Sequence, residues 1–282
     1  MGLSLYRPYT QVISDVDDTL KSSGGVNVAG VALGGIDVQY KRGTFYPGVF
    51  EFMLGVSSHN LDSPESSPPD GGGGAKAASP PKVAVLTARA EEFKAALEIG
   101  PDSKLAVALR STGERSGYSD WGVGPVLYGS VAEWVVQDRK GMRKFSNFER
   151  LLEQDPTGAV MQYVYVGDTG ELDQEAGESM LREYPEVVKA VFLHVVSDGP
   201  DPPIPPPKLI NGRPLVFFRT YAGAAARACQ LGLMGEDGMM RVCVRAEEDL
   251  KALVESGEWT DDKAEELERD VGLCYRTLDG GF

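Results

Sequence analysis

Histidine and cysteine are both scarce in this chain, and their scarcity limits the chemistry that it can use. Only two histidines occur among 282 residues, His59 in a polar stretch and His194 in an apolar run. Catalysis by a histidine base is therefore not expected. The three cysteines, Cys229, Cys243 and Cys274, have no metal-ligand or redox spacing, so we expect small buried side chains in a reducing compartment. Carboxylates, hydroxyls and lysines remain to carry any reaction.

Basic residues are also in short supply. The chain has 28 lysines and arginines against 42 aspartates and glutamates, a formal net charge of −14. A nucleic-acid partner is not expected, because a phosphate backbone would repel such a chain. Net charge alone would not draw it to anionic lipid either. The simplest role of the acidity is to keep the protein soluble.

Long apolar runs are missing as well, and no stretch reaches the length of a membrane span. The first ten residues contain Arg7 and Pro8 and no apolar signal core. Tyr6 stands where a myristoylation motif has Ser or Thr. We therefore expect a cytoplasmic protein. Peripheral contact with membranes and a targeting segment ahead of Met1 are open alternatives.

What the chain does contain is an alternation of short apolar runs with amphipathic segments. Continuously apolar runs are typical of strands buried on both faces, and their alternation with helical patterns predicts a parallel sheet with crossover helices. The apolar fraction of 42% is enough for a sizeable core. The expected strands are residues 11–14, 83–86, 126–128, 163–166, 188–196 and 215–218, and the expected helices are residues 48–54, 90–99, 145–154 and 175–183.

Two segments interrupt this alternation. Residues 57–82 are rich in Ser, Pro and Gly, which predicts a flexible insertion with too little apolar surface to offset its ordering entropy. Residues 200–207 are proline-rich and predict an extended connection, with a polyproline contact to a protein partner as the alternative. The expected parts are a domain at 1–235 and an acidic helical appendage at 236–282, with helices at 246–256 and 260–271.

The first acidic cluster follows the apolar run at residues 11–14. It places Asp15, Asp17 and Asp18 within four residues. Ligands of open α/β sheets collect at the carboxyl ends of strands, and three aspartates this close repel one another unless a cation lies among them. Mg²⁺ prefers such oxygen ligands. The alternative is a strand-ending acidic turn or a helix cap.

A second cluster follows the run at 163–166. There the chain reads Gly167-Asp168, and Asp173 comes five residues later. The glycine would let the backbone approach an ion, and the two carboxylates could complete or orient a Mg²⁺ shell. A glycine-rich turn is the alternative. Two carboxylate clusters at neighbouring strand ends would repel each other without a metal, so the pair predicts a metal site.

A hydroxyl and a group of cations accompany these clusters. Thr87 closes the run at 83–86 and precedes Ala88, and its hydroxyl could donate to a phosphoryl oxygen or cap the next helix. A lysine near a phosphoryl group would offset the negative charge that develops there, whereas the alternative is a solvated basic face. The basic residues are Arg139, Lys140, Arg143 and Lys144, ahead of an amphipathic helix.

Taken in order, these motifs resemble the haloacid-dehalogenase (HAD) superfamily over about residues 11–173. The likeness is greatest to the phosphatidate phosphatase catalytic-domain family. It rests on DVDDTLK at 15–21, YPGV at 46–49 and GDTGELDQE at 167–175. The resemblance implies a HAD-like Rossmannoid α/β fold, with a mainly parallel sheet and helices on both faces. The segment between Asp17 and Thr87 is short once its flexible part is removed, so no large cap domain is expected.

The resemblance also implies catalytic roles. Asp15 would be the nucleophile that forms an aspartyl-phosphate, and Asp17 would protonate the leaving group and then activate water. Thr87 and Ala88 would hold the phosphoryl group together with Lys144.

The same resemblance implies a Mg²⁺ cofactor. Its ligands would come from Asp15, the backbone carbonyl of Asp17, Asp168 and Asp173, and it would shield the phosphate so that one anion can attack another. Lys140 is the rival of Lys144 for the lysine of the motif.

The expected activity is Mg²⁺-dependent hydrolysis of a phosphomonoester, with phosphatidate at a membrane surface as one substrate. The alternatives are a soluble phosphatase for a small metabolite or phosphoprotein, and a catalytically silent binding domain. Leu172 and Gln174 stand where the phosphatidate phosphatase family often has lysine and proline, which leaves the substrate open. A site without a large cap would suit a bulky substrate.

Overall fold

A computed structural model describes most of the chain. The described residues are 9–25, 27–28, 31–32, 35–61, 79–90, 99–129, 140–155, 160–170, 172–200, 202–257 and 261–278. The strands are β1 Tyr9–Ser14, β2 Asn27–Val28, β3 Val31–Ala32, β4 Val83–Ala90, β5 Val123–Gly129, β6 Val160–Asp168, β7 Val188–His194, β8 Lys208–Ile210 and β9 Arg213–Phe218. The helices are α1 Val49–Ser58, α3 Lys104–Arg115, α5 Lys140–Glu153, α6 Asp173–Glu183, α7 Tyr221–Gln230, α8 Glu236–Glu255 and α9 Asp261–Leu278.

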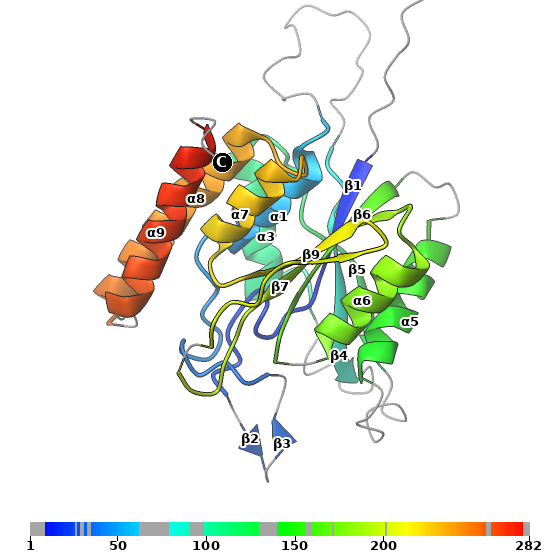
Figure 1. Cartoon of the computed structure of the whole chain (residues 1–282), viewed down its shortest axis with the longest axis horizontal. Coiled ribbons are helices and arrows are strands. Elements are labelled where there is room, and N and C mark those ends of the chain that lie inside the picture. The colour runs from blue at the N-terminus through cyan, green and yellow to red at the C-terminus, as the bar shows by residue number, and fades with distance from the viewer. Residues whose placement is uncertain are drawn as a thin grey trace, which may run out of the picture.

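Seven of these strands form one sheet in the order β5-β4-β1-β6-β7-β9-β8, with helices on both faces (Figure 1). Every neighbouring pair is parallel except β8 and β9, which form an antiparallel edge. The expected α/β class with a mainly parallel sheet is confirmed, and the arrangement is consistent with a Rossmann-like fold. Strand β1 lies between β4 and β6, so the loop that follows β1 emerges between these two strands at the carboxyl edge of the sheet.

Alternate residues of the central strands point into two separate cores. Val12 of β1 and Val164 of β6 contribute to the core under α1, α3, α7, α8 and α9. Ile13 and Tyr165 contribute to the core under α5 and α6. Because both faces are covered, these strands read as continuous apolar runs rather than as alternating ones.

The element boundaries differ from the expected ones in several places. Strand β4 continues to Ala90, past the expected end at 86, because a register shift after Thr87 lets its pairing with β5 resume. Helix α1 extends through Ser58, so residues 57–58 belong to it and not to the insertion. Residues 62–78 of that insertion and 91–98 of the expected helix at 90–99 lie outside the described residues. Helices α3 and α7 and the edge strand β8 were not expected.

The two C-terminal helices complete the first core. Met239, Val242 and Cys243 of α8 are buried there, and so are Leu267 and Cys274 of α9. Both helices are longer than the expected segments at 246–256 and 260–271. The division of the chain at residue 235 stays a prediction. No helix in the described part of the chain is long and apolar enough to cross a membrane.

Helix α1 approaches α8 closely, because glycines lie on the contact. A Cβ atom at Gly55 would lie 2.9 Å from Cε of Met234, just ahead of α8, and one at Gly48 would lie 3.0 Å from the carbonyl oxygen of Val242 in α8. Gly48 also needs its φ of 77°, a left-handed conformation that glycine adopts without strain. Its N–H donates to Oδ2 of Asp249 at 3.0 Å. The N-terminal end of α1 is thereby fixed to α8.

Candidate metal and catalytic site

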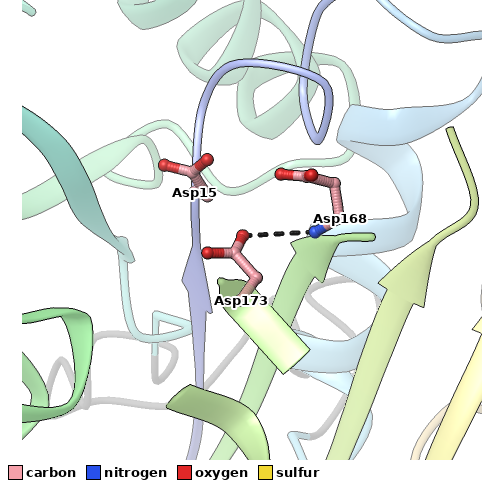
Figure 2. A group of neighbouring side chains, drawn as sticks. All are labelled: Asp15, Asp168 and Asp173. Carbon is pink, nitrogen blue, oxygen red and sulfur yellow. Dashed lines mark hydrogen bonds between the residues drawn. The ribbon is translucent and has the colours of Figure 1, made fainter. Parts of the chain in front are cut away.

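Three aspartates meet at the carboxyl edge of the sheet (Figure 2). Strands β1 and β6 are parallel neighbours with Ser14 opposite Val166, so Asp15 and Asp168 emerge at the same edge. Asp173 begins α6 and points back toward them. One carboxylate oxygen from each lies within 4.8 Å of the others, and all three residues are buried. This group can hold a metal ion.

Lys144 of α5 lies against this group. Its ammonium nitrogen is 3.1 Å from Oδ2 of Asp15 and also donates to Oδ1 of Asp173. Only 1% of the lysine is exposed, so a solvated basic face does not describe it. Three carboxylates and one ammonium leave a formal excess of two negative charges, which is the charge that a divalent cation would balance. The donor set therefore fits a hard divalent ion such as Mg²⁺.

The carboxylates at the end of β6 and the start of α6 accept hydrogen bonds from nearby backbone N–H groups. The N–H of Asp168 donates to Oδ2 of Asp173 at 3.2 Å, and Oδ1 of Asp168 accepts from the N–H of Gly170 at 2.6 Å. A Cβ atom at Gly167 would lie 2.5 Å from Oδ2 of Asp173. The glycine was expected to admit an ion, but what it admits in the structure is the carboxylate of Asp173.

Asp18 does not take part in the carboxylate group. It is completely buried, and its carboxylate accepts three backbone N–H groups, from Ser23 at 2.7 Å, Ile36 at 2.6 Å and Asp37 at 2.9 Å. At Asp18 these N–H donors offset the repulsion that we expected among the three aspartates of the first cluster, and Asp18 was not among the predicted metal ligands. Burial raises the pKa of Asp18, and the backbone hydrogen bonds oppose that shift.

Asp17 lies in the sequence between Asp15, which belongs to the carboxylate group, and Asp18, which does not. Its side chain is half-buried and does not belong to the group formed by Asp15, Asp168 and Asp173. Its backbone forms an isolated bridge with Lys21, which closes the turn after β1. The predicted role of its backbone carbonyl toward Mg²⁺ stays a prediction.

Thr87 reaches the same edge from β4. The register pairs Ser14 of β1 with Val85, so Thr87 stands two residues further along, beside the start of the loop that Asp15 opens. It is 2% exposed and lies inside β4, whereas we expected it to close the strand. Ala88 also belongs to β4, and Lys140 begins α5, but their side chains lie outside the described part of the structure, as does all of Arg139.

Two residues that the sequence did not single out contact consecutive carbonyl oxygens of the loop after β1. Nδ1 of His194 lies 2.7 Å from the carbonyl oxygen of Asp18, and its Nε2 lies 3.0 Å from that of Arg219. The hydroxyl of Tyr221 donates to the carbonyl oxygen of Thr19 at 2.7 Å. The only sequence signal was the position of His194 at the end of an apolar run. Nothing in the sequence marked Tyr221.

Tyr165 lies beneath the carboxylate group. It is completely buried on β6, and among the described residues its hydroxyl has no hydrogen-bond partner. Burial, followed by the charge of Asp173, raises the pKa of this hydroxyl well above its usual value. The phenol therefore stays neutral beside the charged site.

Comparison of the chain with known proteins gave no match, whether to family models, to curated proteins or to solved structures. The arguments about function therefore rest on the geometry of this site.

Proposed function

We propose that this protein is a Mg²⁺-dependent phosphomonoester hydrolase of the HAD type, acting through an aspartyl-phosphate on Asp15. The observation that carries the proposal is the buried contact of Lys144 with both Asp15 and Asp173, next to Asp168. A lone carboxylate cannot readily approach a phosphate dianion. Here an ammonium and a fitting site for a divalent cation flank it, and both would offset the repulsion.

Within this proposal the metal-binding residues divide into two kinds. Asp15 and Asp168 would supply ligand oxygens from adjacent strands. Both oxygens of Asp173 already accept hydrogen bonds, one from Lys144 and one from the Asp168 N–H. Asp173 therefore serves chiefly to orient the other two. When bound, Mg²⁺ supplies charge neutralisation of the phosphoryl oxygens.

The reaction would proceed in two displacements. A carboxylate oxygen of Asp15 forms a bond to phosphorus as the ester oxygen leaves, and Asp17 donates the proton that the leaving alcohol needs. Water then attacks the phosphorus, Asp17 accepts its proton, and the bond to Asp15 breaks, which releases inorganic phosphate. Thr87 and Lys144 would contact the transferred group, one by hydrogen bonding and the other by charge.

The substrate class is part of the proposal. Between β1 and α1 the described residues form only the two-stranded β2–β3 sheet, which leaves the site without a large cover there. The lack of a large cap in this segment suits a bulky ester, and phosphatidate at a lipid surface is the substrate we propose. A soluble metabolite or phosphoprotein is the competing assignment, and a catalytically silent domain is the third.

Phosphate release from 4-nitrophenyl phosphate and from phosphatidate in mixed micelles tests these assignments. The wild type should release phosphate with Mg²⁺ and lose activity in EDTA. Asp15→Asn should lower kcat by a factor of roughly 10⁴ or more, because the amide is not a nucleophile. Asp198→Asn, at an exposed position, is the matched control and should behave as the wild type.

Each outcome has a definite meaning. Metal-dependent release that survives in Asp15→Asn would rule out the aspartyl-phosphate. Activity on the aryl ester with none on phosphatidate would favour the soluble substrates. Folded wild-type protein that hydrolyses neither ester would support the silent domain. Thermal unfolding with and without Mg²⁺ would report separately whether the carboxylate group binds the ion.

A further inference from the structure

The loop after β1 is held from outside at two successive peptide groups. Inside the loop, Asp18 N–H donates to the carbonyl oxygen of Lys21 at 2.7 Å, and Leu20 N–H donates to that of Val16 at 2.9 Å. The carbonyl oxygens of Asp18 and Thr19 instead meet His194 and Tyr221, which lie 176 and 202 residues away in the sequence. These two side chains hold the second and third peptide groups after Asp17, whereas the first is held by the hydrogen bond from Asp18 N–H to Lys21.

We propose that His194 and Tyr221 are positioning residues that direct the carboxyl group of Asp17 toward the leaving group and the attacking water. The inference rests on the proposed function, because it assigns them a part in the proton transfers of that reaction. Neither residue touches the reacting atoms in the proposal. Both act through the loop.

The His194 contact has a defined direction. A carbonyl oxygen can only accept, so the 2.7 Å contact with Asp18 is a hydrogen bond in the tautomer with its proton on Nδ1 of His194; in that tautomer the 3.0 Å contact of Nε2 with the carbonyl oxygen of Arg219 is not one. The ring is held on both sides, with its centroid 4.3 Å from that of Tyr46 and 5.4 Å from that of Phe218. Its backbone lies opposite Asp168 in the pairing of β6 and β7. The imidazole thus ties the Asp17 loop to the strand next to Asp168.

The Tyr221 contact is equally constrained. Tyr221 is the first residue of α7, whose N-cap Thr220 accepts a hydrogen bond from Gly223 N–H. Only 1% of Tyr221 is exposed, and its ring packs 5.0 Å from Phe218 and 5.3 Å from Phe52 between centroids. A hydroxyl on a ring held this firmly fixes the carbonyl oxygen that it meets.

Asp17 itself is half-buried at the sheet edge, and the turn that carries it is only a few residues long. Its direction depends on the peptide groups on either side. On the near side β1 fixes the backbone through its pairing with β4 and β6. On the far side Lys21 holds the adjoining peptide group, and the two external contacts hold the two peptide groups beyond it. A displacement of about 1 Å in a catalytic group can cost roughly a hundredfold in rate.

The test uses two esters with different leaving groups. Proton donation by Asp17 matters most when the departing alkoxide is strongly basic, as from 2-phenylethyl phosphate, and least for 4-nitrophenyl phosphate. Tyr221→Phe removes only the hydroxyl. We expect it to lower kcat/KM for the alkyl ester roughly tenfold more than for the aryl ester. Asp17→Asn removes the proton donor itself, so it should give the largest change in the ratio of kcat/KM for the alkyl ester to that for the aryl ester. Tyr163→Phe, at a buried tyrosine elsewhere on β6, should leave the ratio unchanged.

A pair of His194 variants sharpens the test. Asn places its amide where Nδ1 stands, and Gln reaches the position of Nε2, so only His194→Asn can still donate to the Asp18 carbonyl. We expect the alkyl-to-aryl ratio of His194→Asn to stay nearer the wild-type value than that of His194→Gln. Should both His194 variants fail to fold, Tyr221→Phe decides the question alone.

The outcomes separate the two proposals. A wild type that hydrolyses neither ester overturns the proposed function and this inference with it. An active wild type whose ratio is unchanged in Tyr221→Phe overturns the inference alone, whether or not both rates fall together. A ratio that falls in Tyr221→Phe and His194→Gln but not in Tyr163→Phe supports it.

Discussion

The two loops that carry the candidate site differ in how far away in the sequence their hydrogen-bond partners lie. In the loop after β6, the carboxylates of Asp168 and Asp173 accept N–H groups two and five residues away. In the loop after β1, the carboxylate of Asp18 accepts N–H groups as far as 19 residues away, and the loop's carbonyl oxygens depend on His194 and Tyr221 far along the chain. The carboxylates of the loop after β6 are thus held locally, although its Thr169 also bonds to His194 and Val196, whereas the loop after β1 takes its shape mainly from distant parts of the fold.

The difference predicts which substitutions should disrupt each loop. A local loop is damaged by changes to its own residues, above all by those that alter backbone space. A loop held from outside is damaged by distant substitutions that leave its own sequence intact. Lys144 contacts both loops, through Asp15 after β1 and through Asp173 after β6.

The largest effect is expected where the two loops are joined. Lys144→Met would leave two buried carboxylates without their ammonium, a loss that costs about 3–5 kcal/mol for a broken buried ion pair. We expect kcat to fall by roughly 10³ through the loss of transition-state charge stabilisation. Activity assays and chemical unfolding at several Mg²⁺ concentrations would measure both.

The Lys144→Met variant should also bind Mg²⁺ at least as tightly as the wild type, because the carboxylate group becomes more negative. Weaker binding would show that the lysine helps to build the ion site and does not merely balance its charge. Calorimetric titration with Mg²⁺ distinguishes the two.

A second effect should separate neighbouring residues of the loop after β1. Asp18→Asn replaces one accepting oxygen by a donor that faces backbone N–H groups, so we expect a loss of about 1–3 kcal/mol in unfolding free energy. Asp17→Asn should change stability by less than about 1 kcal/mol and yet lower activity by roughly 10²–10⁴. Equal stability of the two variants would contradict the structural role of Asp18.

The smallest effect is expected from steric crowding in the loop after β6. Gly167→Ala adds a methyl group 2.5 Å from Oδ2 of Asp173, and overpacking of this kind costs about 1–3 kcal/mol. Gly100→Ala, where nothing lies within 4 Å of the added carbon, is the control. Thermal unfolding would compare them, and an unchanged melting temperature for Gly167→Ala would show that α6 can shift to make room.

The same contrast explains how much could be predicted from the sequence. The strand ends at Asp15 and Asp168, and the nearby Asp173, could be predicted because they follow strongly patterned segments. Lys144 was indicated only by the resemblance to a known superfamily, with Lys140 as its rival. The roles of Asp18, His194 and Tyr221 could not be. The partners of Asp18 are backbone N–H groups up to 19 residues further on, and those of His194 and Tyr221 are carbonyl groups that the sheet order and α7 bring close. A single sequence specifies neither arrangement.

The errors in secondary structure have related physical causes. Helix α7 has the sequence YAGAAARACQ, and its small side chains give a weak apolar stripe although the helix is largely buried. Helix α3 carries Ser, Thr and Gly in its last turns, which lowers its helix propensity. The continuation of β4 past Thr87 depends on a register shift against β5, a feature of pairing that no local pattern reveals.

The packing of α1 on α8 has a consequence for biosynthesis. The N–H of Gly48 meets its partner, Asp249, 201 residues later, and the buried face of α1 shares a core with side chains from α8 and α9. A ribosome therefore releases the aspartates of the first loop early, long before the helices that enclose α1. His194 and Tyr221 also emerge late. We expect the core under α1 to stay accessible to chaperones until α8 and α9 have emerged from the ribosome, and the candidate site to take its final arrangement only after that.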